Sequence, residues 1–277
     1  MIRKIKLTSF TMILILIGVM VVGCGSDGLT IGAVTGTTFE AKAKEYPKVE
    51  EVKLYKDDNL TLQELANGRI DGVITDRLVG LIGIQKGGYD NLQLAGDFIY
   101  KETIAVAVRQ NDDALRQAIN KVLAEMIADG TYAAISEKYF GVDILDGVEY
   151  EITFPDEQPA SDDSLRRVKQ AGVIRFAMSG GYPPFNYFTE DDELTGFDVE
   201  IGKEVAAKLG VQYEAVTTDW SGILEGLRSG RYDGIFGSMA ITDERLEVVD
   251  FTDPYYYSGA QLIVVKGSDI TGPEDLE

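Results

Sequence analysis

The sequence has no histidine, one cysteine and one tryptophan in 277 residues, and only 26 basic residues against 46 acidic ones. A single cysteine cannot form a disulfide within the chain, so stability must come from an apolar core. The formal net charge of −20 repels phosphate backbones, which makes nucleic acid a poor partner. Without histidine, the chain lacks the side chain most often used in acid–base catalysis.

The composition is that of a globular protein. Apolar residues make up 45% of the chain and charged residues 26%. This content allows a sizeable core in one large domain or two small ones.

The amino end has the features of a secretory leader. Arg3, Lys4 and Lys6 precede an apolar stretch from Phe10 to Val22, which is the arrangement of a signal peptide. An uncleaved membrane anchor is the alternative, but the stretch is shorter than the ~20 residues that span a bilayer. A cleaved leader is therefore the favoured interpretation.

The leader ends in Val21-Val22-Gly23-Cys24, which resembles the bacterial lipobox. The resemblance implies a signal peptide at residues 1–23 and a lipid anchor on Cys24. Cleavage would change the net charge from −20 to −23, because the leader carries three basic residues and no acidic one. No other stretch is long and apolar enough to cross a bilayer, so we expect the rest outside the cytoplasmic membrane, in a periplasm or on the outer face.

Two internal segments, Leu62–Val73 and Leu224–Ile235, resemble each other. Each predicts a short helix that ends at a glycine, Gly68 or Gly230, followed by a buried strand. The other predicted elements also alternate between strand and helix. The strands are Gly72–Thr75, Gly234–Gly237, Leu29–Val34 and Val173–Met178, and the helices are Phe39–Tyr46, Asp198–Leu209, Asp113–Ala128 and Tyr132–Tyr139. The alternation predicts an α/β fold with mostly parallel sheets and ligands bound beyond the carboxyl ends of strands.

Several motifs carry a family resemblance. They are Gly196-Phe197-Asp198-Val199-Glu200-Ile201, Tyr182-Pro183-Pro184-Phe185, Trp220-Ser221-Gly222-Ile223-Leu224, Ile241-Thr242-Asp243-Glu244-Arg245, Asp250–Tyr256 and Gly32–Thr38. Together they resemble the family 3 solute-binding proteins, which are polar amino-acid receptors of bacterial ABC importers. The resemblance implies a two-lobe, periplasmic-binding-protein-like fold of type II, with the ligand in the interlobe cleft.

The order of the matching segments is reversed. In the family, the segment that resembles Leu165–Glu277 comes first and the one that resembles Leu29–Gly141 comes second. The resemblance therefore implies a circular permutation, in which the acidic residues 142–163 form a linker between the old termini. New ends are tolerated at exposed loops that lie close together.

The permutation has a consequence for the lobes. We expect the small lobe to consist of residues 28–102 plus 263–277 and the large lobe to be continuous over 103–262. The strands Thr103–Val108 and Gln261–Val265 would cross between the lobes and act as the hinge.

A receptor for a free amino acid needs a cation, an anion and a shaped pocket. Arg245 is the candidate for the ligand carboxylate, because a guanidinium can hold two oxygens at once; the alternative is a solvated arginine after the Thr242 cap. Asp76 is the candidate for the ammonium, and it could also cap the following helix. Thr37 and Thr38 offer amides and hydroxyls, or act as caps.

The remaining candidates follow from the resemblance. Tyr182 and Trp220 resemble the family's aromatic walls, with core packing as the alternative, and Ser238 and Ala240 would supply backbone groups. Ser179 stands where many receptors for basic amino acids have an aspartate. Its presence favours a ligand with a neutral or acidic side chain.

The predicted function is an extracytoplasmic, lipid-anchored, monomeric receptor that delivers an amino acid to an ABC permease, with no metal or cofactor. One alternative is a dehydratase of the cyclohexadienyl dehydratase type, since relatives of this fold have that activity. It requires a positioned general acid, and no pair of cleft carboxylates is evident in the sequence. The other alternative is a receptor for a signalling partner.

Overall fold

A computed structural model describes residues 28–147 and 158–277. The predicted leader, Cys24 and the middle of the predicted linker lie outside the described residues. Across the two described ranges, none of the helices combines the length and the apolar character that crossing a membrane requires.

One mixed sheet runs through the described chain, in the strand order β2-β1-β3-β11-β4-β10-β5-β9. Its strands are β1 (Leu29–Val34), β2 (Val49–Tyr55), β3 (Gly72–Asp76), β4 (Leu92–Arg109), β5 (Val173–Met178), β9 (Gln212–Thr217), β10 (Gly234–Ala240) and β11 (Val249–Val265). β1 is parallel to β2 and β3, and β5 is parallel to β9 and β10. β11 and β4 are antiparallel to each other and to their outer neighbours β3 and β10.

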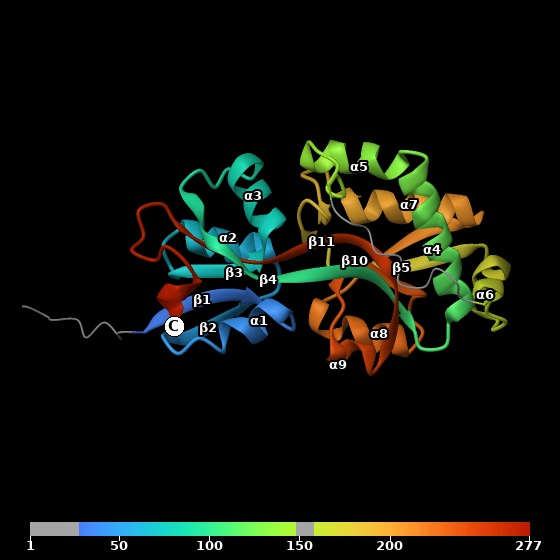
Figure 1. Cartoon of the computed structure of the whole chain (residues 1–277), viewed down its shortest axis with the longest axis horizontal. Coiled ribbons are helices and arrows are strands. Elements are labelled where there is room, and N and C mark those ends of the chain that lie inside the picture. Colours follow the sequence, from blue (N-terminus) through green and yellow to red (C-terminus); the bar gives the residue numbers. More distant parts are fainter. Residues whose placement is uncertain (1–27, 148–157) are drawn as a thin grey trace, which may run out of the picture.

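The helices form two groups, at opposite ends of the long strands β4 and β11 (Figure 1). The first group contains α1 (Thr38–Ala43), α2 (Asp58–Ala66) and α3 (Arg77–Lys86). The second contains α4 (Asp113–Ala128), α5 (Thr131–Phe140), α6 (Ser164–Ala171), α7 (Phe197–Leu209), α8 (Ile223–Arg228) and α9 (Asp243–Leu246). A small sheet of β6 (Gly181–Tyr182), β7 (Asn186–Phe188) and β8 (Leu194–Thr195) and two 3-10 turns, η1 (Trp220–Gly222) and η2 (Pro273–Leu276), complete the described part.

The pair β4–β11 is the structural link between the two groups. The pairing runs from Val249 opposite Arg109 to Val265 opposite Leu92 and has three register shifts, one of them beside Gln261. There, β4 bulges at Gly96, whose φ is +65°. The buried Gln261 amide fills the bulge and donates to the carbonyl of Gly96 at 3.1 Å.

Many sequence predictions are confirmed. Leu29–Val34, Val173–Met178 and Asp113–Ala128 have the predicted bounds. Gly68 and Gly230 follow the ends of their helices with φ of +67° and +75°, a conformation that favours glycine.

Two predictions need correction. The helix predicted at Phe39–Tyr46 ends at Ala43, because Tyr46 precedes Pro47 and the residue before a proline disfavours helical backbone. The sheet is mixed rather than mostly parallel, since the two central strands, β4 and β11, oppose their neighbours.

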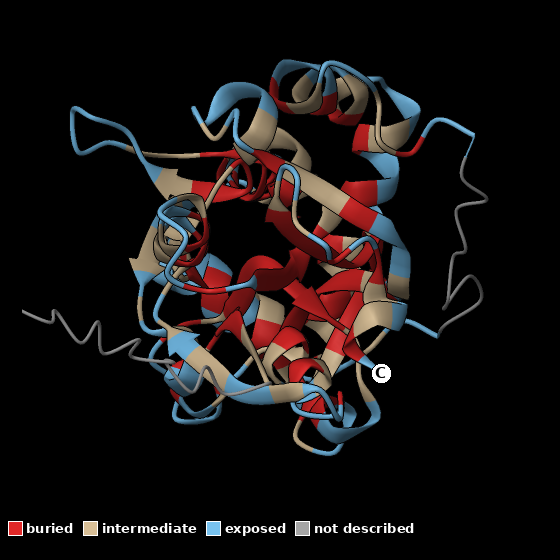
Figure 2. Cartoon of the chain, turned by 90° about the vertical axis from the view of Figure 1, so that its left-hand side faces the viewer, coloured by how far each residue is buried: buried red, intermediate tan, exposed pale blue. Residues whose placement is uncertain are grey.

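The core lies along the central strands, and exposed residues lie on the outer turns and helix faces (Figure 2). At the α7 end it contains a cluster of buried aromatic rings. Tyr255 packs edge-on against Phe236, and Tyr256 stacks on Phe185, both with centroids 4.9 Å apart. Buried rings each remove ~150–250 Å² from water, so this cluster contributes strongly to the core at this end of the sheet.

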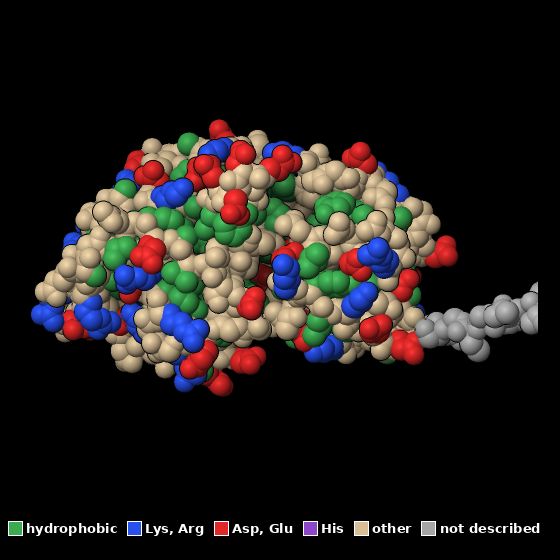
Figure 3. Space-filling view, turned by 180° about the vertical axis from the view of Figure 1, so that it is seen from behind, with side chains coloured by type: hydrophobic (Ala, Val, Ile, Leu, Met, Phe, Trp, Pro, Cys, Tyr) green, Lys and Arg blue, Asp and Glu red, His purple; other side chains and the backbone are tan. Residues whose placement is uncertain are grey.

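The outer surface carries charges of both signs. On the face shown in Figure 3, acidic and basic side chains are interspersed with apolar ones. The acidic excess is therefore not gathered into one patch on that face.

Candidate functional site

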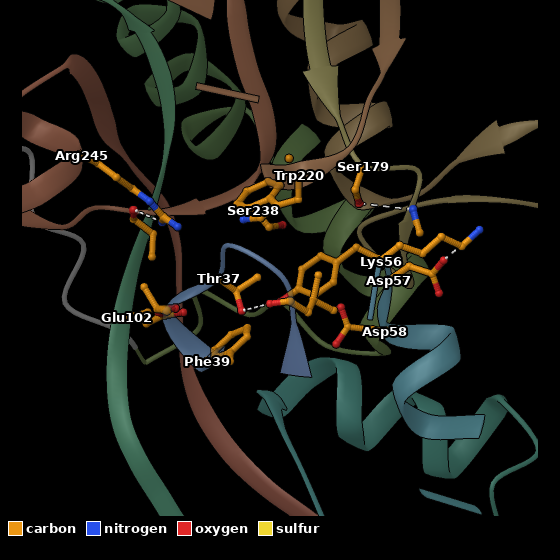
Figure 4. A pocket seen from close by; sticks show the side chains of 16 residues that line it. Thr37, Phe39, Lys56, Asp57, Asp58, Glu102, Ser179, Trp220, Ser238 and Arg245 are labelled. Atoms are coloured by element: carbon orange, nitrogen blue, oxygen red, sulfur yellow. Dashed lines mark hydrogen bonds and ion pairs between the residues drawn. The ribbon is translucent and has the colours of Figure 1, made fainter. Parts of the chain in front are cut away.

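A pocket lies between the two groups of elements, beside the ends of β1 and β10 (Figure 4). It spans about 480 Å³, part of which is open to solvent. Sixteen residues line it: Val34, Thr37, Thr38, Phe39, Lys56, Asp57, Asp58, Glu102, Ser179, Gly181, Tyr182, Trp220, Gly237, Ser238, Ala240 and Arg245. A lining of apolar walls with a few polar groups is typical of small-molecule sites.

The structure brings together eight of the nine residues that the sequence suggested for ligand binding. They are Thr37, Thr38, Ser179, Tyr182, Trp220, Ser238, Ala240 and Arg245. The ninth, Asp76, is buried at the end of β3 and is not among the lining residues.

Arg245 is a buried cation that faces the pocket from α9. Its side chain is held by a 2.7 Å hydrogen bond from Nη1 to the Ala240 carbonyl, and its guanidinium lies 5.9 Å from the centre of the Trp220 ring. Burial lowers its pKa, although the charge of Glu102 opposes this. Within the described residues no carboxylate forms an ion pair with Arg245, so the guanidinium can accept an external anion.

Thr242 caps α9 through a 3.2 Å bond from the Arg245 amide. The cap that the sequence suggested as an alternative is therefore present, but Arg245 is only 8% exposed. The interpretation as a solvated arginine is wrong.

The first turn of α1 forms the opposite wall. Thr37 donates from its hydroxyl to the Val34 carbonyl at 2.7 Å and accepts from the Glu40 amide at 3.2 Å. It therefore caps α1 and lines the pocket at the same time. Thr38 donates to Glu102 Oε1 at 2.5 Å.

Glu102 was missed from the sequence. It lies on β4 opposite Ser258 of β11 and is 8% exposed. Burial raises its pKa, opposed by the hydrogen bond from Thr38 and the charge of Arg245. The available signal was a charged residue directly before the apolar run Thr103–Val108, because a charge next to a buried strand requires a partner.

Asp58 was also missed. It begins α2, is 4% exposed and accepts a hydrogen bond from the Thr75 hydroxyl. Burial raises its pKa to about 7. Glu102 and Asp58 both line the pocket, so the structure reveals two cleft carboxylates that were not evident in the sequence. Their burial depends on distant parts of the chain, which short motifs do not reveal.

The two oxygens of Asp76 differ in their hydrogen bonds. Oδ1 accepts from the Leu78 amide at 2.7 Å and so caps α3, whereas the buried Oδ2 makes no hydrogen bond of good geometry among the described residues. Burial, with the charge of Glu102, raises the pKa of this carboxyl to about 7. The Ser258 hydroxyl still lies close enough to lower the pKa of the carboxyl through a hydrogen bond. The capping role is confirmed, and the charge of Asp76 contributes to raising the pKa of Tyr182, after the larger effect of burial.

Ser238 is held in an unusual conformation by a buried network. Its φ is +59°, uncommon for a residue with a side chain. Its hydroxyl donates to Asp198 at 2.9 Å and its amide donates to the Tyr255 hydroxyl at 3.0 Å. Tyr255 and Asn186 donate to the same carboxylate at 2.7 and 2.8 Å. Asp198 therefore positions the pocket end of β10.

Ser179 is also engaged within its own loop. Its hydroxyl donates to Asn186 Oδ1 at 3.1 Å and accepts from the Gly181 amide at 3.3 Å. Tyr182 stacks on Phe185 with centroids 5.2 Å apart, so this wall is preformed.

The two walls touch on both sides of the pocket. A Cβ on Gly181 would lie 2.5 Å from Asp57 Cβ, and one on Gly36 would lie 3.3 Å from Ser221 Cα. On the α3 side, Lys86 Nζ donates to the Tyr139 carbonyl at 3.2 Å.

The fold and the site define an α/β solute-binding protein. The family model for bacterial extracellular solute-binding proteins, family 3, matches residues 19–142 and 174–275. The chain belongs to this family.

Named relatives and solved structures match parts of the chain. The L-cystine-binding protein TcyJ of Escherichia coli is 39% identical over 40% of this chain and 42% of its own length. The L-arginine-binding protein of Pseudomonas aeruginosa is 37% identical over 36% of this chain and 39% of its own. Holo ArgBP from T. maritima is 36% identical over 33% of this chain and 40% of its own, with a TM-score of 0.33. The chain thus spans about two fifths of the length of the curated relatives it matches.

Proposed function

We propose that the protein is an extracytoplasmic receptor that binds a free amino acid and delivers it to an ABC importer. The observation that carries this proposal is the buried Arg245 guanidinium, which faces a pocket of a family 3 chain without an ion-pair partner among the described residues. The leader at residues 1–23 would direct export, and a lipid on Cys24 would then hold the mature protein at the outer face of a membrane or in a periplasm.

In the proposed complex, the ligand carboxylate pairs with Arg245 and the ammonium with Asp76. The charge of Asp76 acts on Tyr182, which lines the pocket, and this proximity to the lining supports its role. Tyr182 and Trp220 would cover the aliphatic part of the ligand.

We propose that binding closes two lobes, residues 28–102 plus 263–277 and residues 103–262. β4 and β11 pass from one group of elements to the other, which supports their role as the hinge. The contacts across the pocket, such as Gly181 against Asp57, are those expected of a closed form.

The chain order is proposed to be a circular permutation, with residues 142–163 joining the ancestral termini. Hydrogen bonds at both ends of the described chain support it. The Leu29 amide donates to the Lys48 carbonyl at 2.8 Å, and the Lys48 amide donates to the Leu276 carbonyl at 3.1 Å. Two segments that bond to one residue are close enough to have been continuous.

The test is a thermal-shift panel of the twenty common amino acids and cystine on the purified protein. A ligand at 100 times its dissociation constant stabilises by about 2.7 kcal/mol, which raises the melting temperature by several degrees. If no amino acid does so, the proposal fails. Sedimentation of the same sample checks the expected monomer, and amino-acid uptake in cells with and without an ABC permease separates import from signalling.

A dehydratase is the second candidate function, because the structure supplies a candidate general acid that was not evident in the sequence. Glu102 is a pocket carboxyl with a raised pKa, which is the property of a general acid. Incubation with prephenate tests it directly. Release of an aromatic product that contains a carboxylate would establish dehydratase activity. Unchanged prephenate would leave the amino-acid receptor as the proposed function.

A further inference from the structure

Asp58 presents an unused carboxylate oxygen to the pocket. Thr75 donates to Oδ1, but no hydrogen bond or ion pair among the described residues uses Oδ2. The side chain is 4% exposed and belongs to the pocket lining. Its open oxygen is therefore directed at whatever fills the pocket.

Among the described residues no cation forms an ion pair with this carboxylate. Asp57, the adjacent acidic residue, raises its pKa further. The nearest basic residue in sequence, Lys56, is 73% exposed and reaches Asp57, with 3.7 Å between Nζ and Oδ2. A buried carboxylate without a cation is costly, and a positive group on the ligand would offset that cost.

Asp58 and Arg245 lie on opposite sides of the pocket, with Glu102 on the Arg245 side (Figure 4). A ligand whose carboxylate pairs with Arg245 would thus direct its far end at Asp58. This separation distinguishes Asp58 from a group that binds the α-ammonium beside the carboxylate.

We propose that Asp58 selects amino acids that carry a second protonated nitrogen at the far end of the side chain. The proposal rests on the amino-acid receptor function above and names the ligand class of the same site. It departs from the expectation based on Ser179, because that expectation considered the β5 side of the pocket alone. The opposite wall, α2, supplies the anion instead.

Two kinds of ligand share this chemistry. In lysine the second nitrogen is a terminal ammonium, and in cystine it belongs to a second complete amino-acid head. Alanine lacks it, and glutamate carries the opposite charge at that end. Comparing the affinities of the four ligands therefore distinguishes a terminal ammonium from a second amino-acid head. It also distinguishes both from a pocket that does not select ligands by charge.

The experiment is isothermal titration calorimetry of these four ligands into the wild-type protein and two variants. Asp58→Asn keeps the shape and the acceptor for Thr75 but removes the charge. Glu64→Gln is the matched control, because it removes one charge from the same helix at a residue that pairs with Arg69 and does not line the pocket.

We expect the wild type to bind lysine or cystine more tightly than alanine and glutamate. Asp58→Asn should weaken the favoured ligand by roughly ten- to hundredfold, the usual worth of a hydrogen bond between charged groups, while alanine is unaffected. Glu64→Gln should change neither the affinity for the favoured ligand nor the affinity for alanine. Tighter binding of lysine would identify a single terminal ammonium, and tighter binding of cystine a second head.

Three results would overturn the inference. If alanine or glutamate binds the wild type as tightly as lysine and cystine, Asp58 does not select, and the receptor function still stands. If Asp58→Asn and Glu64→Gln weaken binding equally, the effect is one of overall charge. If no amino acid binds at all, the receptor function fails and this inference fails with it.

Discussion

The Thr38 hydroxyl donates a 2.5 Å hydrogen bond to Oε1 of Glu102. The bond ties the first turn of α1 to the central strand β4 across the pocket wall. Since Glu102 is only 8% exposed, the hydroxyl is one of few groups that can stabilise its charge.

Thr38→Val removes this bond without changing the shape of the side chain. It should lower the free energy of unfolding by about 1–3 kcal/mol, because a buried carboxylate loses a donor. Urea unfolding followed by circular dichroism measures the change. Thr38→Ser, which keeps the hydroxyl, should retain most of the stability, and equal losses in both variants would contradict the assigned role of the bond.

Arg245→Ala should abolish ligand binding in the thermal-shift panel. Charge-assisted bonds contribute about 1.5–3 kcal/mol each, so losing two would weaken binding by more than roughly a hundredfold. Arg228→Ala is the control, because Arg228 is an exposed arginine on α8 that pairs with Glu225. Binding that survives Arg245→Ala would remove Arg245 from the site.

Trp220 provides a direct optical signal for the same site. It is the only tryptophan of the chain and lies 5.9 Å from the Arg245 guanidinium. We expect ligand addition to change the intensity or wavelength of its emission, with a midpoint that matches calorimetry. Emission that stays constant while calorimetry reports binding would place the ligand away from Trp220.

Gly181→Val should impair closure rather than folding. A Cβ at this position would lie 2.5 Å from Asp57 Cβ, which belongs to the opposite wall. Ligand affinity should fall by about tenfold or more, since the variant destabilises only the closed state, while the melting temperature of the ligand-free protein changes little. Gly222→Ala is the control, because its Cβ would meet no atom within 4 Å. A large drop in the ligand-free melting temperature would contradict this interpretation.

Stability should fall as the pH rises from about 4 to about 7. Burial raises the folded-state pKa of Asp198 from 3.8 to about 7, with Tyr255, Asn186 and Ser238 opposing the shift through their hydrogen bonds. Between those two values the folded state holds a proton that the unfolded state has lost, so raising the pH favours unfolding. Melting curves from pH 4.5 to 7.5 measure the slope, and Asp198→Asn should reduce it. An unchanged slope would show that Asp198 does not titrate in this range.

Reversing the proposed permutation should preserve function. A gene that joins Glu277 to Gly28 through a short linker, and opens the chain between Gly147 and Gln158, should yield a protein with the same ligand order. The bonds of Leu29 and Leu276 to Lys48 place the joined ends together. Loss of folding in that variant, with the original chain as control, would contradict the proposed circular permutation.

The sequence predicted the local elements better than the long-range ones. Asp113–Ala128 was predictable because its apolar face repeats at helical spacing. The full length of β4 was not, since polar residues at Lys101 and Glu102 and the bulge at Gly96 interrupt the strand pattern. Pairing with β11, far along the chain, overrides those local signals.

The same distinction applies to the site. Arg245 was predictable because a motif surrounds it and its chemistry suits a carboxylate. Glu102 and Asp58 were not, because acidic residues in an acidic chain are ordinarily exposed, and only the packed elements bury them.

The pairing of β4 and β11 along most of their length has a consequence for how the protein unfolds. These two strands supply the central strands of both groups of elements, from Leu92 opposite Val265 to Arg109 opposite Val249. Neither group can therefore lose its central strands while the other keeps a full sheet. We expect heat and denaturant to unfold the chain in one cooperative transition, although the elements form two groups in Figure 1.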